Sequence, residues 1–310
     1  VGYMTDVAVS GSHVFVSSIE RGVHIYDIGD AELPEVSQIP GSRIGGLVVR
    51  DSVIYALGGG QLFTIDATDP TQPQLVNSLG IGGWSSHIVA AGDYLYAANG
   101  YGLRVIDVTD PFSATIVGSY NTLDFSNHVV ISDAVAYVAD GASGLLAIDV
   151  SDPTNPNLLG QHNTPGQAYR VALDGSLAYV ADWDSLQIID ISSPSEPSPV
   201  GVVEDISMAV SVVLVAPYAY VATLYDGLYV VDITEPEVPT VSSILDMGDG
   251  MVGGLTRSGD LLYVSTSTGS GAIVDVSEPA MPVVLATYTT PSGGGGQLVG
   301  LAREVVHQLD

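Results

Sequence analysis

The stretch GLRVIDVTDP (Gly102–Pro111) decides the fold, because close variants of it return along the whole chain. Seven copies can be recognised, and their central aspartates follow one another at intervals of 39 to 43 residues: Asp27, Asp66, Asp107, Asp149, Asp190, Asp232 and Asp275. A period of this length, with turn residues at fixed offsets, is typical of a repeat architecture rather than of separate domains.

Each repeat contains four short apolar runs separated by turn residues. In the fourth repeat these runs are Asn127–Ile131, Val135–Ala139, Leu145–Val150 and a run that begins at Asn157–Leu159. Runs this short, rich in Val, Ile, Leu and Tyr and bounded by Gly, Pro, Asp or Ser, indicate antiparallel strands. Four strands in about 42 residues match one blade of a propeller. We therefore predict an all-β, seven-bladed β-propeller of four-stranded repeats, with an eight-bladed ring or a partial eighth repeat as the alternative.

Two further positions recur in the repeats, and both have a structural interpretation. The central aspartates are expected to accept backbone N–H groups in the turn that follows the third strand. An aromatic residue occupies the same place in the second strand of each repeat, where we expect it to pack one repeat against the next. The set is Phe15, Tyr55, Tyr96, Tyr137, Tyr179, Tyr220 and Tyr263.

These repeats resemble the LVIVD repeat family, through runs such as Arg104–Val108 and Tyr229–Ile233 and through the motif Asp-x-Ser/Thr-Asp-Pro-x-x-Pro. Departures from the motif occur at Ala31 and Ala114, where prolines would be expected. The resemblance implies a propeller of seven or eight blades from a secreted or surface-attached protein. It implies no particular activity.

The repeats predict one domain over residues 1–292, followed by an appendage. Residues 293–310 begin with a flexible run of glycines, Gly293–Gly296, and continue with a segment that is compatible with a closing strand, the start of an eighth repeat or a short helix. No apolar run is long enough for a membrane helix, so direct membrane insertion is not expected.

The charge balance excludes some partners. Asp and Glu number 35 against 7 Arg and no Lys, for a formal net charge of -28, and the chain has no Cys. Nucleic acids and anionic membranes need a basic surface, so neither is an expected partner. Such acidity suits salty surroundings, where ions screen self-repulsion. With the family resemblance, it predicts an extracellular or cell-surface protein of an organism from a saline environment.

The candidate site lies where the first strands begin, at the mouth of the central channel. The position 20 or 21 residues before each central aspartate is variable, while the next position is apolar in all seven repeats. This variable position carries His87, His128 and Arg170 on three consecutive repeats. Neighbouring loops and second-strand ends on the same face add the remaining candidate ligand-binding residues, which are Trp84, Asn99, Asn127, Asp140, Tyr169, Asp182 and Trp183.

Four interpretations of this cluster remain open. His87, His128 and Asp140 are candidate ligands for a metal such as Zn²⁺. His128 or Tyr169 is a candidate general base, with Arg170 neutralising a substrate carboxylate, as in a polysaccharide lyase or hydrolase. The aromatic and amide groups would also serve glycan binding without chemistry. Finally, the polar residues could simply hydrogen-bond one another and hold water.

Calcium is the other candidate ion. Asp182–Asp184 and Asp246–Gly250 resemble fragments of calcium loops but lack the full ligand spacing. The function that the sequence favours is a binding or scaffold module that presents one propeller face to a glycan or protein partner. Self-assembly is a further alternative, and the polysaccharide-active enzyme is the competing hypothesis.

Overall fold

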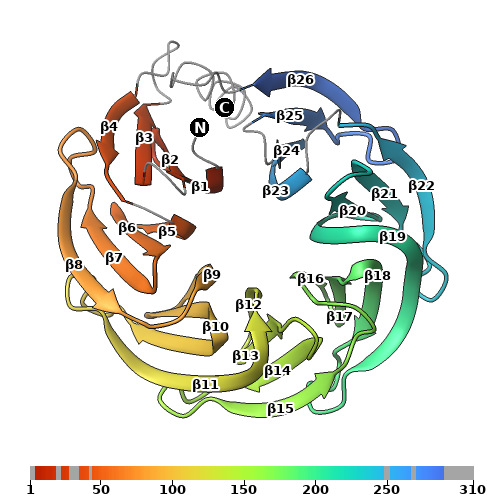
Figure 1. Cartoon of the computed structure of the whole chain (residues 1–310), viewed down its shortest axis with the longest axis horizontal. Coiled ribbons are helices and arrows are strands. Elements are labelled where there is room, and N and C mark those ends of the chain that lie inside the picture. The colour runs from red at the N-terminus through yellow and green to blue at the C-terminus, as the bar shows by residue number, and fades with distance from the viewer. Residues whose placement is uncertain are drawn as a thin grey trace.

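The computed structural model describes residues 4–18, 22–27, 35–41, 44–247, 252–266 and 270–289. The sheets stand around a central axis, each with one strand beside the axis and one at the periphery (Figure 1). Within these ranges no helix has the length and hydropathy needed to cross a bilayer. The arrangement confirms the predicted all-β propeller. The predicted appendage at 293–310 lies outside the described residues.

Four of the sheets have the predicted meander of four antiparallel strands. The first contains β1 (Met4–Ser10), β2 (His13–Ser18), β3 (Gly22–Asp27) and β4 (Glu35–Ile39). The second contains β5 (Ile44–Arg50), β6 (Val53–Gly58), β7 (Gln61–Asp66) and β8 (Gln74–Gly80). The third contains β12 (His128–Ser132), β13 (Val135–Ala139), β14 (Leu145–Asp149) and β15 (Asn157–His162). The fourth contains β23 (Val252–Ser258), β24 (Leu261–Thr266), β25 (Ser270–Asp275) and β26 (Val283–Thr289).

The two other sheets depart from this pattern. One has three strands, β9 (Ser85–Ala91), β10 (Tyr94–Asp107) and β11 (Thr115–Ser126). The other has seven strands, which are β16 (Arg170–Asp174), β17 (Leu177–Ala181), β18 (Trp183–Asp190), β19 (Ser198–Val215), β20 (Tyr218–Thr223), β21 (Leu228–Asp232) and β22 (Thr240–Leu245).

The predicted division into seven uniform four-stranded blades, or into eight, is therefore wrong. The described strands form six hydrogen-bonded sheets, because β19 joins two expected blades into one sheet, while the continuous β10 leaves another sheet with three strands. Strand β10 continues through the bend at Asn99–Gly102, where two strands were expected. Strand β19 runs from the periphery to the axis, since its inner half still pairs with β18 through Trp183 and Ala209 (Figure 1).

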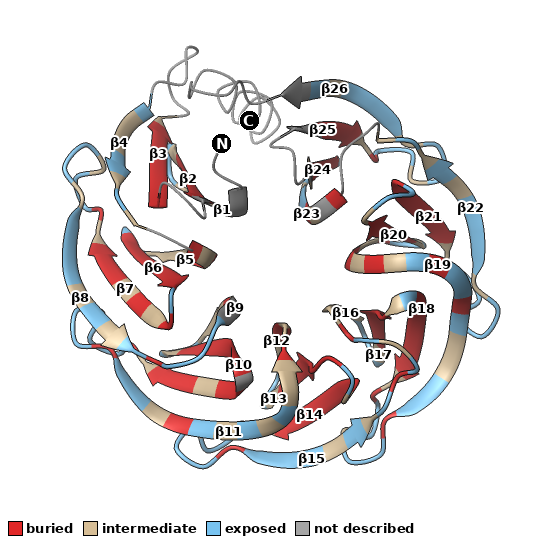
Figure 2. Ribbon diagram, viewed as in Figure 1, coloured by how far each residue is buried: buried red, intermediate tan, exposed pale blue. Residues whose placement is uncertain are grey.

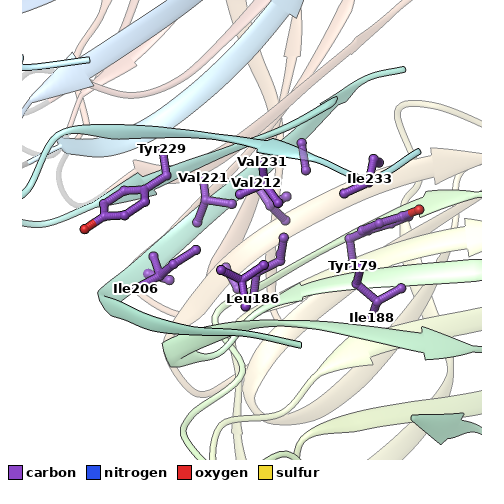
Figure 3. Close-up of a cluster of buried hydrophobic side chains, with 13 residues drawn as sticks. Tyr179, Leu186, Ile188, Ile206, Val212, Val221, Tyr229, Val231 and Ile233 are labelled. Atoms are coloured by element: carbon purple, nitrogen blue, oxygen red, sulfur yellow. The ribbon is translucent and has the colours of Figure 1, made fainter. Parts of the chain in front are cut away.

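The core lies between neighbouring sheets, as the recurring aromatic residues predict. Figure 2 shows buried residues concentrated on the two middle strands of each sheet and exposed ones on the outer strands. Tyr179 packs with Val221 and Val231 of the following repeat, which β19 joins to its own in one sheet, in the cluster drawn in Figure 3. The side chain of Tyr220 is fully buried, and its hydroxyl donates to the carbonyl of Pro279, 2.7 Å away, in the turn of the next repeat.

Among the described residues, the turn after the third strand forms as predicted. In six repeats the carboxylate of the central aspartate accepts the backbone N–H two residues later at 2.8–2.9 Å, as Asp149 does from Ser151. The side-chain hydroxyl of Ser151 and, after it, this backbone N–H lower the pKa of the Asp149 carboxyl. A second aspartate, such as Asp152, closes the following turn in the same way. All these bonds lie at one end of the sheets, which we call the turn face.

Glycines on the outer strands allow close contact between repeats at the turn face. A Cβ at Gly118 would collide with the carbonyl oxygen of Pro153, and one at Gly201 with that of Pro236. Each glycine therefore lets the turn of the following repeat lie directly on the outer strand.

Candidate functional site

The predicted site residues lie at the opposite end of the sheets, which we call the rim face. In each repeat the second strand ends beside the start of the first. His87 pairs with Ala98, His128 with Ala139 and Arg170 with Ala181. The inner strands β9, β12 and β16 are neighbours around the axis (Figure 1). The structure thus brings together the three residues that the variable position predicted.

The imidazoles of His87 and His128 stack on each other. Their ring centroids are 3.9 Å apart and the ring planes differ by 28°. His128 is 7% exposed. Within the described part of the chain, the Nδ1 atoms of both rings are buried and have no hydrogen-bond partner.

Both imidazoles are neutral at pH 7. Burial, and after it the positive charge of Arg170, lowers the pKa of His87 to about 3, while a hydrogen bond to the backbone of Val129 acts in the opposite direction. Burial, then His87 and Arg170, hold the pKa of His128 well below its usual value. Neutral imidazoles are suited to accept hydrogen bonds or bind metals, but with so low a pKa they are weak general bases.

The geometry does not assemble the predicted metal site. Nowhere in the described ranges do three His, Cys, Asp or Glu side chains come close enough together to hold a metal ion. Asp140 is fully buried at the end of β13, and its Oδ1 accepts a 2.6 Å hydrogen bond from the Ser126 hydroxyl. Its Oδ2 is also buried, with no partner among the described residues.

The polar residues at the second-strand ends fasten the loop that enters each repeat. The Asn99 amide donates to the carbonyl of Ile81 at 2.7 Å. Asp182 accepts from the Thr164 hydroxyl and, at 2.8 Å, from the backbone N–H of Gly166. Burial raises the pKa of Asp182, and these two hydrogen bonds oppose the shift. These side chains thus hold the loops in place, and a direct role in ligand binding stays a prediction.

Asn127 has a similar linking role. Its amide donates to the carbonyl of Ala168 at 2.9 Å, which joins the start of β12 to the loop before β16.

The two calcium-loop fragments differ in what the structure describes. In Asp182–Asp184 the carboxylate of Asp182 is already engaged in hydrogen bonds to the entering loop. In Asp246–Gly250, residues 248–250 lie outside the described residues.

Tyr169 and Trp183 form an aromatic pair at the rim face. Their ring centroids are 5.2 Å apart, and both residues are half-buried. Trp183 has a φ of 60°, in the left-handed region that bulky residues rarely adopt. The N–H of Asp184 donates to the carbonyl of Asp182 at 2.6 Å, so Trp183 is the centre of a three-residue turn. Backbone strain of this kind is concentrated at functional sites.

Exposed apolar side chains also occur in other repeats at the rim face. Trp84 is 63% exposed in the loop before β9, as its predicted role requires. Sequence reasoning missed Leu123, which is 94% exposed near the end of β11, and Tyr225, which is 67% exposed in the β20–β21 loop. The signal for Tyr225 was present, since Tyr225–Asp226 occupies the same loop as Trp183–Asp184 in the preceding repeat.

Comparisons with known proteins agree with this fold. The model of a family described as LVIVD repeat matches residues 1–35, 82–122, 126–164, 165–205, 207–246 and 249–290. No curated protein matches the chain.

Several solved structures have a similar fold at low sequence identity. The computationally designed Ika8 protein is 12% identical, with a TM-score of 0.72 over 93% of this chain and 87% of its own. BamB from Moraxella catarrhalis is 14% identical, with a TM-score of 0.68 over 92% and 88%. Chaetomium thermophilum Sqt1, bound to the N-terminus of ribosomal protein L10, is 13% identical, with a TM-score of 0.68 over 93% and 87%.

Proposed function

Because this chain belongs to the LVIVD repeat family, whose model matches most of its length, we propose that it is a binding module that holds a protein partner at the rim face. We further propose that it acts outside the cell or at the cell surface, in saline surroundings. The absence of Lys and the net charge of -28 support the saline surroundings, where ions screen self-repulsion.

The aromatic pair Tyr169–Trp183 carries the proposal. Trp183 begins β18 and Tyr169 directly precedes β16, and Trp183 keeps a strained backbone conformation with its ring against Tyr169. Partly exposed aromatic side chains on a rigid scaffold are the residues that contribute most to protein interfaces. Trp84, Leu123 and Tyr225 extend the apolar surface over neighbouring repeats of the same face.

The charge of the rim indicates the character of the partner. Asp184, Glu204 and Asp226 are exposed beside the aromatic residues. A strongly negative protein attracts and orients a positively charged surface, which speeds association and rejects acidic competitors. We therefore expect a partner with a basic contact surface.

Similar propellers offer a precedent for a protein partner. Sqt1, for example, was solved with the N-terminus of ribosomal protein L10 bound. At 13% identity the likeness shows the shared fold, and it supports the proposal only as an example of what such a ring can do.

A glycan is the second candidate, and the same aromatic pair favours it. The apolar faces of Tyr169 and Trp183 could stack on a sugar ring. The enzyme hypothesis has less support, because burial holds the pKa of His128, one of its two candidate bases, well below the usual value and so makes it a weak base at neutral pH.

The test compares exposed apolar residues of the two faces. Immobilised parent protein, Trp183→Ala, Trp84→Ala and the control Met281→Ala are incubated with extracellular protein of the source organism. Met281 is 71% exposed in a turn of the opposite face. We expect one protein that the parent and Met281→Ala retain and the two rim variants lose. Calorimetry with that purified protein should show affinity at least tenfold weaker for Trp183→Ala, a loss of about 1.4 kcal/mol.

Two results would contradict the proposal. One is capture that survives both rim substitutions, and the other is capture lost equally in Met281→Ala. A glycan array probed with the same four proteins covers the second candidate. Glycan binding lost in Trp183→Ala, without any captured protein, would replace the protein partner by a sugar.

A further inference from the structure

Three residues at the channel mouth form a group that the proposed protein interface does not use. His87, His128 and Arg170 lie at or near the starts of the neighbouring inner strands β9, β12 and β16. The two rings are stacked, and the charge of Arg170 acts on both of them. His87 and Arg170 are half-buried, whereas Nδ1 of His87 is buried, so a ligand reaches that atom only if the atoms that cover it move.

The His87 ring has an unused acceptor. Its hydrogen bond to the Val129 backbone favours the protonated ring, so the imidazole is the donor in that bond. Because Nδ1 has no partner among the described residues, the donating atom is Nε2. In a neutral imidazole the other nitrogen then carries a lone pair. Buried polar atoms in native proteins are nearly always paired, and this one calls for an O–H or N–H donor.

The charge of the group is that of a single guanidinium. Since both imidazoles are neutral at pH 7, Arg170 supplies the only formal charge of the three. A planar guanidinium matches the two oxygens of a carboxylate, and a single positive charge balances a monoanion. In a chain of net charge -28, a multiply charged anion would meet strong repulsion.

We propose that His87, His128 and Arg170 bind a carboxylate that also carries a hydroxyl group, the chemistry shared by sugar acids and small hydroxy acids. The carboxylate pairs with Arg170, and the hydroxyl donates to Nδ1 of His87. The stacked ring of His128 holds the His87 ring in position. This site goes beyond the proposed partner-binding function, because it requires neither a partner protein nor the aromatic pair.

Four probe compounds distinguish the contribution of the carboxylate to binding from that of the hydroxyl. Glucuronate and lactate carry both a carboxylate and a hydroxyl, acetate carries only the carboxylate, and glucose carries only hydroxyls. Thermal melting and calorimetry are run with each probe on the parent, on Arg170→Gln and on the control Arg50→Gln. Arg50 also lies on an inner strand, but at the turn-face end, beside Asp93.

We expect glucuronate, lactate or both to bind the parent and Arg50→Gln, and to bind Arg170→Gln at least tenfold more weakly. Binding of glucuronate alone identifies a sugar acid as the ligand, and equal binding of lactate identifies a small hydroxy acid. The proposal is overturned if neither binds, if acetate or glucose binds as well as they do, or if Arg170→Gln retains full affinity.

An NMR measurement on the parent protein keeps the test independent of variant folding. The ¹⁵Nδ1 resonance of His87 is followed during titration with lactate and with acetate, and is assigned with His87→Phe. A new hydrogen bond to Nδ1 should shift this resonance with lactate and leave it unchanged with acetate. An unmoved resonance at saturating lactate would refute the hydroxyl contact. Trp183→Ala should keep this response while losing the partner protein, which separates failure of this site from failure of the proposed function.

Discussion

The turn face and the rim face of the propeller are built from the same strands, but they differ in how closely their residues repeat and in how their polar groups are hydrogen-bonded. At the turn face each repeat has nearly the same residues, and its aspartates are saturated with short backbone hydrogen bonds. At the rim face the residues change from repeat to repeat, and buried polar atoms such as Nδ1 of His87 and Nδ1 of His128 lack partners among the described residues. Positive φ at non-glycine residues does not separate the faces, since it occurs at Asp51 and Ser52 of the turn face as well as at Trp183 of the rim face. The contrast indicates that the turn face maintains the ring and the rim face is free for binding.

The largest effect is expected from a glycine near the turn face. Gly201→Ala places a Cβ against the carbonyl oxygen of Pro236, so the outer strand and the next turn must separate. We expect the free energy of unfolding to fall by about 2–3 kcal/mol. The matched control is Gly80→Ala on the outer strand β8, where the new Cβ would meet only the side chain of Gln61, at 3.7 Å. Urea unfolding of both variants measures the difference, and equal stabilities would refute this role of Gly201.

Acid should test the buried imidazoles of the rim face. The pKa of His87 is about 3 in the folded protein and ordinary, near 6.5, in the unfolded chain. Between these values the unfolded chain binds more protons, so stability is lost as the pH falls below 6.5. The loss is about 1.4 kcal/mol per pH unit, or up to about 3 kcal/mol at pH 4.

The check is a comparison of pH profiles. His87→Phe should lose less stability between pH 6.5 and 4 than the parent, whereas His13→Phe, in the β1–β2 hairpin, should follow the parent. The carboxylates titrate similarly in all three proteins, so the difference between profiles isolates His87. Parallel profiles for the parent and His87→Phe would show that His87 does not resist protonation.

The smallest effect should come from backbone strain at the rim face. Asp205 is exposed with a φ of 63°, and glycine adopts this conformation without a side-chain clash. We expect Asp205→Gly to be neutral or to stabilise by a few tenths of a kcal/mol, up to about 0.5. Asp184→Gly, exposed in a neighbouring loop without a positive φ, should destabilise instead. Thermal melting of both tests this, and a loss for Asp205→Gly as large as that for Asp184→Gly would contradict it.

The features that repeat and act locally were predictable from sequence. The hydrogen bond from Ser151 to Asp149 joins residues only two positions apart, and an aromatic residue recurs at the position of Tyr179 in every repeat. The repeat pattern of the sequence was therefore sufficient to predict both features. The division into sheets was not predictable. Whether Val203–Ala209 leaves the sheet or keeps pairing with β18 depends on Trp183, a residue distant in sequence.

For the site, the sequence placed residues better than it assigned their roles. The variable position correctly put His87, His128 and Arg170 at one end of the channel, because strand alternation and repeat length determine that position. It could not distinguish Asp182, which is buried under loop bonds, from Trp183 beside it, which is half-buried and paired with Tyr169. That distinction depends on how the entering loop folds over the strand end.

Strand β19 also determines where new termini or a duplication could be introduced into this chain without breaking a hydrogen-bonded ladder. Between β15 and β16 the chain passes from one sheet to another, so a duplication or new termini there would leave every ladder intact. A break within Val203–Ala209 would instead divide a seven-stranded sheet in the middle. The two repeats joined by β19 therefore form one unit of about 80 residues, twice the sequence period, which any rearrangement that preserves the ladders must move together.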